Sequence, residues 1–246
     1  MYNFFVEGGA ETGGVFRITG TDHNHIKNVL RMREDDTFLV SCEGKSHLCR
    51  LCGFEDDATL AEIVEKDYQD TELPVQIYLF QGLPKGDKLE LIIQKAVELG
   101  ACGIIPVEMN RSVVKLDEKK KKSKQERWQA IAESAAKQSK RNLIPTVSEA
   151  VSYKNAMKLA SEMDVFLVPY ENERGMAATS EALSKINGGS KVGVLIGPEG
   201  GFDDSEISAA KENGGDIVSL GKRILRAETA AITALSMCML YIEMNV

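Results

Sequence analysis

The chain has 246 residues, of which 43% are hydrophobic and 27% are charged, and its net charge is -7. This length suits one large domain or two modest ones, and the composition is that of an ordinary soluble globular protein. We expect a cytoplasmic protein, because no apolar run approaches the roughly 18 residues of a membrane span and residues 1–11 lack the pattern of a signal peptide. The acidic charge argues against indiscriminate binding of nucleic acid but is compatible with a local basic face.

Residues 1–70 are expected to form a small β-rich domain. Short apolar runs separated by Gly and Asp clusters are typical of strands. The expected strands are Tyr2–Val6, Val15–Ile18, Phe38–Ser41, Ser46–Gly53 and Ala58–Glu65. The polar segment Asp67–Pro74 follows them. We therefore place the boundary to a second domain, residues 71–246, within this segment.

A basic stretch lies inside the first domain. Its four cations are Arg17, Lys27, Arg31 and Arg33. Asp22 is the only acidic residue between positions 17 and 33. Residues 23–33 are expected to form a short helix. It would bury Ile26, Val29 and Leu30. The cations are either a solvated helix face or a surface that contacts phosphates, and charge alone does not decide between the two.

No metal site is expected. His47, Cys49 and Cys52 offer three ligands, but there is no second C-x-x-C to complete a tetrahedral site. Alternation along a strand would instead place Cys49 and Leu51 on the same face, as small core residues. The two histidines of the basic stretch also lack a nearby carboxylate or thiol, so packing or RNA contact is the better interpretation.

From Val75 onward, apolar strands alternate with helical segments. This order predicts a parallel sheet with helices on both faces. The expected strands are Val75–Phe80, Gly103–Pro106, Ile144–Val147, Val165–Val168, Val192–Ile196 and Ile217–Leu220. The expected helices are Asp87–Leu99, Ser123–Ser139, Tyr153–Ser161, Ala178–Ile186, Ser205–Glu212 and Ala227–Met244.

Positive charge accumulates between Arg111 and Arg141, where eleven Lys or Arg stand against four Asp or Glu, a local balance of +7. We interpret much of the KKKKSK tract (119–124) as a flexible solubilising loop. Arg111, Arg127 and Arg141 flank apolar segments and are better placed to contact phosphates. Trp128 has apolar neighbours at helical spacing, which predicts core packing rather than stacking on a base.

Two glycine-containing loops are expected at one edge of the parallel sheet, where α/β proteins usually bind ligands. The first is Gly197–Gly201, and Asp203 and Glu206 after it form a capping-box pattern that predicts a helix. The second is Gly221–Arg223. Neither loop has a dinucleotide or triphosphate pattern, so the glycines would let the backbone approach a flat ligand. A plain strand-to-helix turn remains the alternative.

The final helix has a wide apolar stripe. Its repeating members are Ala231, Leu235, Cys238 and Ile242. Ala230, Ala234 and Met237 widen the stripe beyond what a surface helix needs. This pattern indicates either an ordinary buried helix or a subunit interface.

Taken together, these motifs resemble the SPOUT methyltransferases. The strings that carry the resemblance are HNHIKNVLRMR (23–33), QKAVELG (94–100), IGPEGGF (196–202) and LGKRILRAETA (220–230). Within that superfamily they are similar to the ribosomal RNA small subunit methyltransferase E family, over nearly the whole chain. The resemblance implies an α/β fold with a C-terminal SPOUT parallel-sheet domain containing a deep trefoil knot. It also implies a small N-terminal β-rich PUA-like RNA-binding domain and a homodimer.

Two departures from the family pattern fall in these strings or beside them. Asp35 replaces a common glycine, which is tolerable if the turn needs a left-handed residue. Lys222 replaces a common proline, which would loosen the second loop.

The resemblance implies methyl transfer from S-adenosylmethionine to N3 of a uridine in 16S ribosomal RNA of the small subunit, the equivalent of uridine 1498. Arg226 would stabilise negative charge on the base, and Glu199 or Glu228 would remove its proton. Glu228 has an alternative role as a carboxylate at a helix N-terminus. The implied cofactor contacts are Leu195, Ile196, Gly197, Pro198, Gly200, Gly201, Leu220, Gly221, Ile224, Leu225 and Thr229. The expected RNA contacts are Arg17, Lys27, Arg31, Arg33, Arg111, Arg127 and Arg141.

Two other functions remain open. A SPOUT enzyme that modifies a ribose 2′-hydroxyl or transfer RNA would share the cofactor loops but not the N-terminal string. A non-catalytic RNA-binding ribosome assembly protein would need the basic tract but no intact cofactor loops. The first is distinguished by the position of the methyl group, and the second by equilibrium binding of S-adenosylmethionine.

Overall fold

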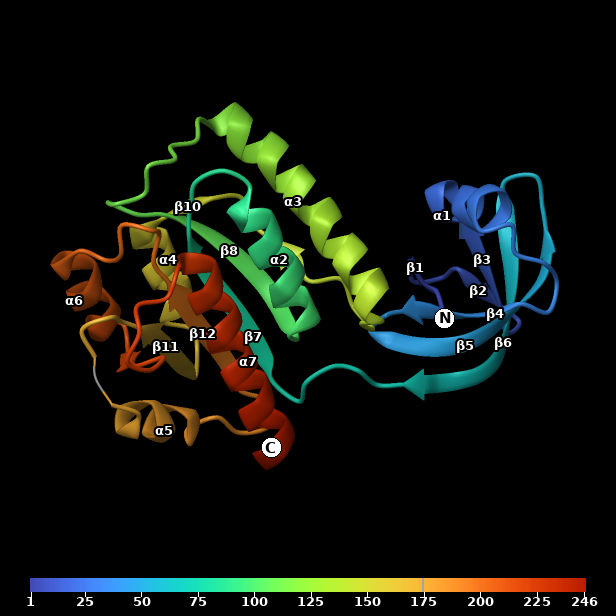
Figure 1. Ribbon diagram of the computed structural model, residues 1–246. Helices are drawn as coiled ribbons and strands as arrows, with labels where there is room; N and C mark the ends of the chain where they lie inside the picture. Colours follow the sequence, from blue (N-terminus) through green and yellow to red (C-terminus); the bar gives the residue numbers. More distant parts are fainter. Residues whose placement is uncertain (174) are drawn as a thin grey trace. The chain divides into compact units, whose positions relative to one another are not determined.

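The computed structural model describes residues 1–173 and 175–246, and the chain divides into two compact units (Figure 1). The first unit comprises Met1–Glu72 and Ala136–Ile144, and the second comprises Leu73–Ala135 and Pro145–Val246. The sequence pattern predicts a single boundary near residue 70. The structure differs because a later segment returns to the first unit and forms hydrogen bonds there.

The first unit contains a six-stranded sheet in the order β1-β4-β5-β6-β3-β2. Its strands are β1 (Asn3–Val6), β2 (Glu11–Thr12), β3 (Val15–Thr19), β4 (Thr37–Cys42), β5 (Lys45–Phe54) and β6 (Ala58–Gln69). Neighbours are antiparallel except β1 and β4, which are parallel. Alternation along β5 buries both Cys49 and Leu51 in the core, as predicted. Burial raises the pKa of the Cys49 thiol to about 12, so this cysteine is a neutral core group.

A short helical segment follows β3. The helix α1 (Gly20–Asn24) continues into the π-helical turn η1 (His25–Val29). Of Ile26, Val29 and Leu30, which are predicted to be buried, Ile26 is buried and Leu30 packs partly buried against the core, but the prediction is wrong for Val29, which is 65% exposed. The i→i+5 pattern of a π-helix widens the turn and rotates Val29 out of the stripe that a 3.6-residue period predicts. Asp35 has a φ of 71°, so the turn after this segment does take a left-handed residue.

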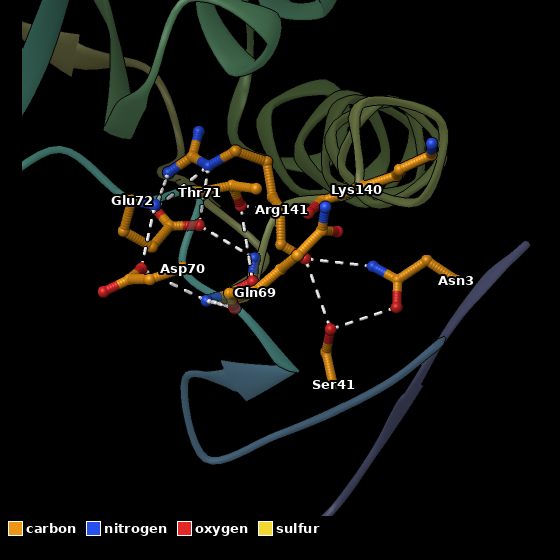
Figure 2. Close-up of polar contacts among 9 residues, drawn as sticks. Asn3, Ser41, Gln69, Asp70, Thr71, Glu72, Lys140 and Arg141 are labelled. Carbon is orange, nitrogen blue, oxygen red and sulfur yellow. Dashed lines mark hydrogen bonds and ion pairs between the residues drawn. The ribbon is translucent and has the colours of Figure 1, made fainter. Parts of the chain in front are cut away.

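Arg141 is the centre of a buried polar network that joins the returning segment to the rest of the first unit (Figure 2). Its guanidinium donates to the Glu72 carboxylate from Nε at 2.9 Å and from Nη2 at 2.5 Å, and its side chain is 3% exposed. Its carbonyl oxygen accepts hydrogen bonds from Asn3 Nδ2 at 3.0 Å and Ser41 Oγ at 3.3 Å. Arg141 therefore stabilises this unit. Its burial and its partner correct the expectation that it contacts phosphate.

The second unit contains a parallel sheet in the order β10-β8-β7-β12-β11-β13, with β9 also paired to β8. The strands are β7 (Gln76–Gly82), β8 (Ala101–Glu108), β9 (Thr146–Val147), β10 (Val151–Ser152), β11 (Val165–Pro169), β12 (Lys191–Ile196) and β13 (Gly215–Val218). The α/β architecture is the predicted one. Because β11 lies between β12 and β13, the carboxyl ends of three adjacent strands meet at one edge.

The remaining helices are α2 (Lys88–Glu98), α3 (Glu118–Ser139), α4 (Tyr153–Ala160), α5 (Ala177–Leu183), α6 (Asp204–Glu212) and α7 (Ala227–Asn245). One core packs α4 and α6 against the sheet and includes Phe80, Phe166, Leu195 and Ile207. The helices α2 and α7 pack against each other and against the sheet (Figure 1). The predicted apolar stripe of α7 is buried: Ala231, Leu235, Cys238 and Ile242 are all inaccessible to solvent.

The basic tract at 119–124 belongs to α3, which begins at Glu118 rather than at the expected Ser123. Asp117 accepts a hydrogen bond from the backbone N–H of Lys120 at 2.9 Å, which caps the first turn. Hydrogen bonds from Lys120 also lower the pKa of the Asp117 carboxyl. The prediction of a flexible loop here is therefore wrong. Trp128 is 4% exposed and lies in the core, as predicted.

Candidate active site

A cavity of about 350 Å³ lies where the loops after β11, β12 and β13 meet. These loops leave the carboxyl ends of adjacent parallel strands, the usual position of ligands in open α/β sheets. The cavity is within the size range of small-molecule sites. It lies entirely in the second unit.

The loop after β12, Gly197–Gly201, is fixed by a residue of the segment that follows β8. Arg111 Nη1 donates a hydrogen bond to the carbonyl oxygen of Gly200 at 3.0 Å. A Cβ added at Gly200 would lie 2.9 Å from the Cβ of Arg111, so no larger residue fits without a shift. Gly201 has a φ of 69°, which favours glycine. The loop is therefore a fixed turn whose shape depends on its glycines.

A capping box fixes the helix that follows this loop, as predicted. Asp203 accepts from the backbone N–H of Glu206 at 2.9 Å, and Glu206 accepts from the backbone N–H of Asp203 at 3.0 Å. Glu206 is 2% exposed and also accepts from the backbone N–H of Asn110 at 2.8 Å. Hydrogen bonds from Ser205 and Asn110 lower the pKa of the Asp203 carboxyl to about 2. Hydrogen bonds from Asn110 to the Glu206 and Asp203 carboxylates thus join the β8 loop to the start of α6.

The loop after β13 is fixed at its base and open at its tip. Thr179 Oγ1 accepts from the backbone N–H of Ser219 at 3.0 Å and donates to the Ser219 carbonyl at 2.9 Å. Gly221 has a φ of 106°, and Ile224 is 86% exposed. Arg226 is the N-cap residue of α7, and its exposed guanidinium makes no ion pair within residues 1–173 and 175–246. An apolar side chain and a cation are therefore available to a ligand on this loop.

Eight of the eleven expected cofactor contacts line the cavity. They are Ile196, Gly197, Pro198, Gly201, Leu220, Gly221, Ile224 and Leu225. Leu195 does not, because side chains alternate along β12 and its own is in the core beneath α4 and α6. Gly200 is turned toward Arg111, and Thr229 is exposed outside the cavity. Of the three expected catalytic residues, Arg226 and Glu199 line the cavity and Glu228 does not.

Lys88, at the start of α2, connects the two candidate carboxylates. Its Nζ lies 2.8 Å from Glu199 Oε1 and 3.7 Å from Glu228 Oε2. Glu199 also accepts a hydrogen bond from the backbone N–H of Lys85 at 3.1 Å. Burial alone would raise the pKa of Glu199, but the hydrogen bonds from Lys88 and the backbone outweigh it and lower that pKa. Both carboxylates are therefore held against α2, and Glu199 is a weakened base.

A third wall of the cavity comes from the loop after β11, which the sequence motifs do not include. Tyr170 and Glu171 line it beside Phe202, and the rings of Tyr170 and Phe202 meet edge to face with their centroids 6.2 Å apart. No motif marked Tyr170 or Glu171, because their place depends on the strand order. Lys88 was also missed, since only its distance from Glu199 in space reveals its part in the site.

The expected RNA contacts differ in their surroundings. Two of them are exposed arginines that form ion pairs: Arg17 pairs with Glu55 and Asp57, and Arg127 pairs with Glu90. Lys27 Nζ lies 5.5 Å from the centre of the half-exposed Phe54 ring. Arg31 and Arg33 are exposed, and their side chains form no ion pair with any residue the structure describes. Arg111 is exposed beside the first loop. These six residues remain available to a polyanion, whereas Arg141 does not.

Within the described residues, no three His, Cys, Asp or Glu side chains are grouped so that they could hold a metal ion. None of the described helices has the length and apolar character needed to cross a membrane.

The family model of the RNA methyltransferase domain matches residues 71–239. The fold and the cavity thus belong to an RNA methyltransferase. The ribosomal RNA small subunit methyltransferase E of Bacillus subtilis is 41% identical over 96% of this chain and 95% of its own. That of Mesomycoplasma hyopneumoniae is 35% identical over 97% of this chain and 99% of its own. The chain belongs to the ribosomal RNA small subunit methyltransferase E family.

A solved structure supports this assignment. The ribosomal RNA small subunit methyltransferase E of Neisseria gonorrhoeae, determined with S-adenosyl methionine bound, is 32% identical and has a TM-score of 0.82. The alignment covers 98% of this chain and 97% of that one. The likeness therefore extends over both units.

Proposed function

We propose that this enzyme methylates N3 of a uridine in 16S ribosomal RNA, at the equivalent of position 1498, with S-adenosylmethionine as the methyl donor. The observation that carries the proposal is the cavity at the ends of β11, β12 and β13, in a chain whose family is named for modification of small-subunit RNA. A ribosomal substrate also implies that the enzyme works in the cytoplasm.

The residues of the cavity suit an adenosine-containing donor. Ile196, Leu220, Ile224 and Leu225 provide apolar surface for a flat ring, and the adjoining glycine loops offer backbone groups at close approach. S-adenosylmethionine supplies a methyl group on a sulfonium centre, which is reactive without further activation. The main task of the protein is therefore to hold the donor and the base in line.

Arg226 is the residue we assign to stabilisation of the reacting base. A uridine N3 carries a proton and its lone pair is delocalised, so N3 must lose that proton to attack, and the ring then carries negative charge until N3 bonds to the methyl group. The exposed guanidinium of Arg226 lies at the cavity, where a cation can offset that charge. Its position at the N-terminus of α7 adds a favourable helix dipole.

Glu199 and Glu228 are assigned a positioning role in place of proton abstraction. Glu199 is ionised and accepts a hydrogen bond from Lys88, and its pKa is lowered. Glu199 is therefore a poor base. Glu228 lies in the first turn of α7, outside the cavity and facing Lys88. We propose that solvent takes the N3 proton while Arg226 stabilises the anion. Replacing Glu199 by Gln should then reduce turnover by less than about ten-fold.

RNA binding is assigned to both units. We propose that the first unit is a PUA-like domain and that Arg17, Lys27, Arg31 and Arg33 contact phosphates there. In the second unit, Arg111 and Arg127 would contribute. Cationic positions in two units suit a folded ribosomal particle better than a short RNA, and equal methylation of an isolated hairpin would contradict this.

The second unit is proposed to be a knotted SPOUT domain that forms a homodimer. The knot is implied by the resemblance of the strings IGPEGGF (196–202) and LGKRILRAETA (220–230) to those of SPOUT enzymes. Support for the dimer comes from apolar side chains that remain exposed on the paired helices: Leu91 on α2 is 42% exposed, and Leu240 and Met244 on α7 are 49% and 72% exposed. Sedimentation of the purified protein as a monomer would contradict the dimer.

Transfer of a labelled methyl group tests the function. Purified protein would be incubated with labelled S-adenosylmethionine and small ribosomal subunits from cells that lack this activity. We expect label in 16S RNA with the wild type and with Glu199→Gln, and very little with Arg226→Ala. Cofactor binding without transfer to any small-subunit RNA would contradict the assigned substrate.

A further inference from the structure

The charges around the cavity are divided between its walls. On the loop after β13, Lys222, Arg223 and Arg226 line the cavity and are all exposed. Glu171 also lines the cavity, from the loop after β11. A ligand in the cavity thus meets cations from one wall and a carboxylate from another.

The position of Glu171 follows from backbone contacts of the residues beside it. The N–H of Tyr170 donates to the Val218 carbonyl at 3.0 Å, which continues the pairing of β11 with β13. The N–H of Glu173 donates to the Tyr170 carbonyl at 3.1 Å, closing a turn around Glu171. The carboxylate is then above the first glycine loop: a Cβ built on Gly201 would lie 3.4 Å from Glu171 Oε2.

Glu171 differs from Glu199, the other acidic residue of the cavity. The Glu199 carboxylate forms an ion pair with Lys88 and accepts a hydrogen bond from the backbone N–H of Lys85. In contrast, no residue among 1–173 and 175–246 donates a hydrogen bond to the Glu171 carboxylate. Glu171 can therefore accept hydrogen bonds from a cationic group of a ligand.

We propose that Glu171 binds the α-ammonium group of the methionine part of the methyl donor. The inference rests on the proposed function and adds a recognition residue to it. An amino-acid group is a zwitterion, and Lys222 and Arg223 complement its carboxylate while Glu171 complements its ammonium. Such charge-assisted hydrogen bonds are stronger than neutral ones and impose direction, so Glu171 orients the donor.

Equilibrium binding tests this role without any need for turnover. Titration calorimetry would compare wild type, Glu171→Gln and Glu173→Gln with three ligands: S-adenosylmethionine, S-adenosylhomocysteine and 5′-methylthioadenosine. The last ligand has the adenosine and the thioether but no amino-acid group. Glu173 is the matched control, because it belongs to the same turn but does not line the cavity.

We expect Glu171→Gln to weaken binding of S-adenosylmethionine and S-adenosylhomocysteine roughly ten-fold, with 5′-methylthioadenosine unaffected. Glu173→Gln should bind all three ligands like the wild type. Unchanged affinity of Glu171→Gln, an equal loss for 5′-methylthioadenosine, or a loss confined to the sulfonium ligand would each overturn the inference. These three outcomes leave the proposed function intact. If the wild type binds none of the three ligands, the proposed function itself fails.

Discussion

Lys88 Nζ donates a 2.8 Å hydrogen bond to Glu199 Oε1, which joins the start of α2 to the glycine loop after β12. The same ammonium group lies 3.7 Å from Glu228 Oε2 in the first turn of α7. One cation thus connects two elements that shape the cavity. The loop keeps its position because a lysine, two carboxylates and a backbone N–H share one small polar cluster.

Replacing Lys88 by Met should raise the pKa of Glu199, since the strongest hydrogen bond that lowers it is lost. In the wild type, the ionised Glu199 stabilises the folded state at pH values above its unfolded-state pKa. This stabilisation is lost as the pH falls through the lowered folded-state pKa. The difference in melting temperature between wild type and Lys88→Met should therefore be largest at neutral pH and small in acid. Carboxyl NMR would follow Glu199 directly.

Lys85→Met is the matched control for that experiment. Its backbone N–H, not its side chain, donates to Glu199, so the hydrogen bond survives the substitution. An unchanged Glu199 pKa in Lys88→Met, or the same rise in both variants, would show that Lys88 is not the residue that sets it.

Arg226→Ala should lower kcat by about 10²–10³, the typical cost of losing one group that stabilises developing negative charge. Cofactor affinity should change by only a few-fold, because the residues that line the rest of the cavity are untouched. Single-turnover kinetics and calorimetry would separate the two effects. Normal turnover at saturating cofactor, with weak cofactor binding, would contradict the electrostatic role.

Arg141→Met should destabilise the first unit by about 3 kcal/mol, because it leaves the Glu72 carboxylate, which is only 16% exposed, without its main partner. Lys66→Met breaks an exposed ion pair with Glu11 in the same unit and should cost less than about 1 kcal/mol. Urea denaturation would measure both. An Arg141→Met protein of wild-type stability with weakened RNA binding would contradict the structural role and restore the phosphate contact.

Gly82→Ala should weaken cofactor binding by distorting the glycine loop next to it. A Cβ at Gly82 would lie 2.7 Å from the backbone nitrogen of Pro198, so the end of β7 and the loop would have to separate. Gly188→Ala is the control, because its Cβ would meet only Val246 Cγ1, at an ordinary 3.8 Å. Equal affinities in the two variants would mean that this close approach does not shape the cavity.

The helices and strands of the second unit follow closely from local sequence signals. The strand β12 ends where Gly197 and Pro198 stop the apolar run, and α6 begins at the capping box that Asp203 and Glu206 predict. The predictions are wrong where a second local signal overrides the one that was used. A run of lysines is typical of a solvated loop, but Asp117 caps the first turn of α3, and the lysines are helical.

Strand order is the part of the site that local sequence signals do not contain. The motifs predict the loops after β12 and β13 as neighbours, and β11 lies between them. Tyr170 and Glu171 enter the cavity for that reason alone. Arg141 shows the same limit in the first unit. Its place in a basic tract beside an apolar segment predicts phosphate contact, and only its long-range partners Glu72 and Asn3 reveal its burial.

The identity of the modified atom is the most direct test of the central claim. Small ribosomal subunits lacking the modification would be methylated with purified protein, and the 16S RNA would be digested and mapped by mass spectrometry of its nucleosides. We predict one methyl group per subunit, as 3-methyluridine at the equivalent of position 1498. A methyl group on a ribose 2′-oxygen or at another base atom would contradict the proposed reaction.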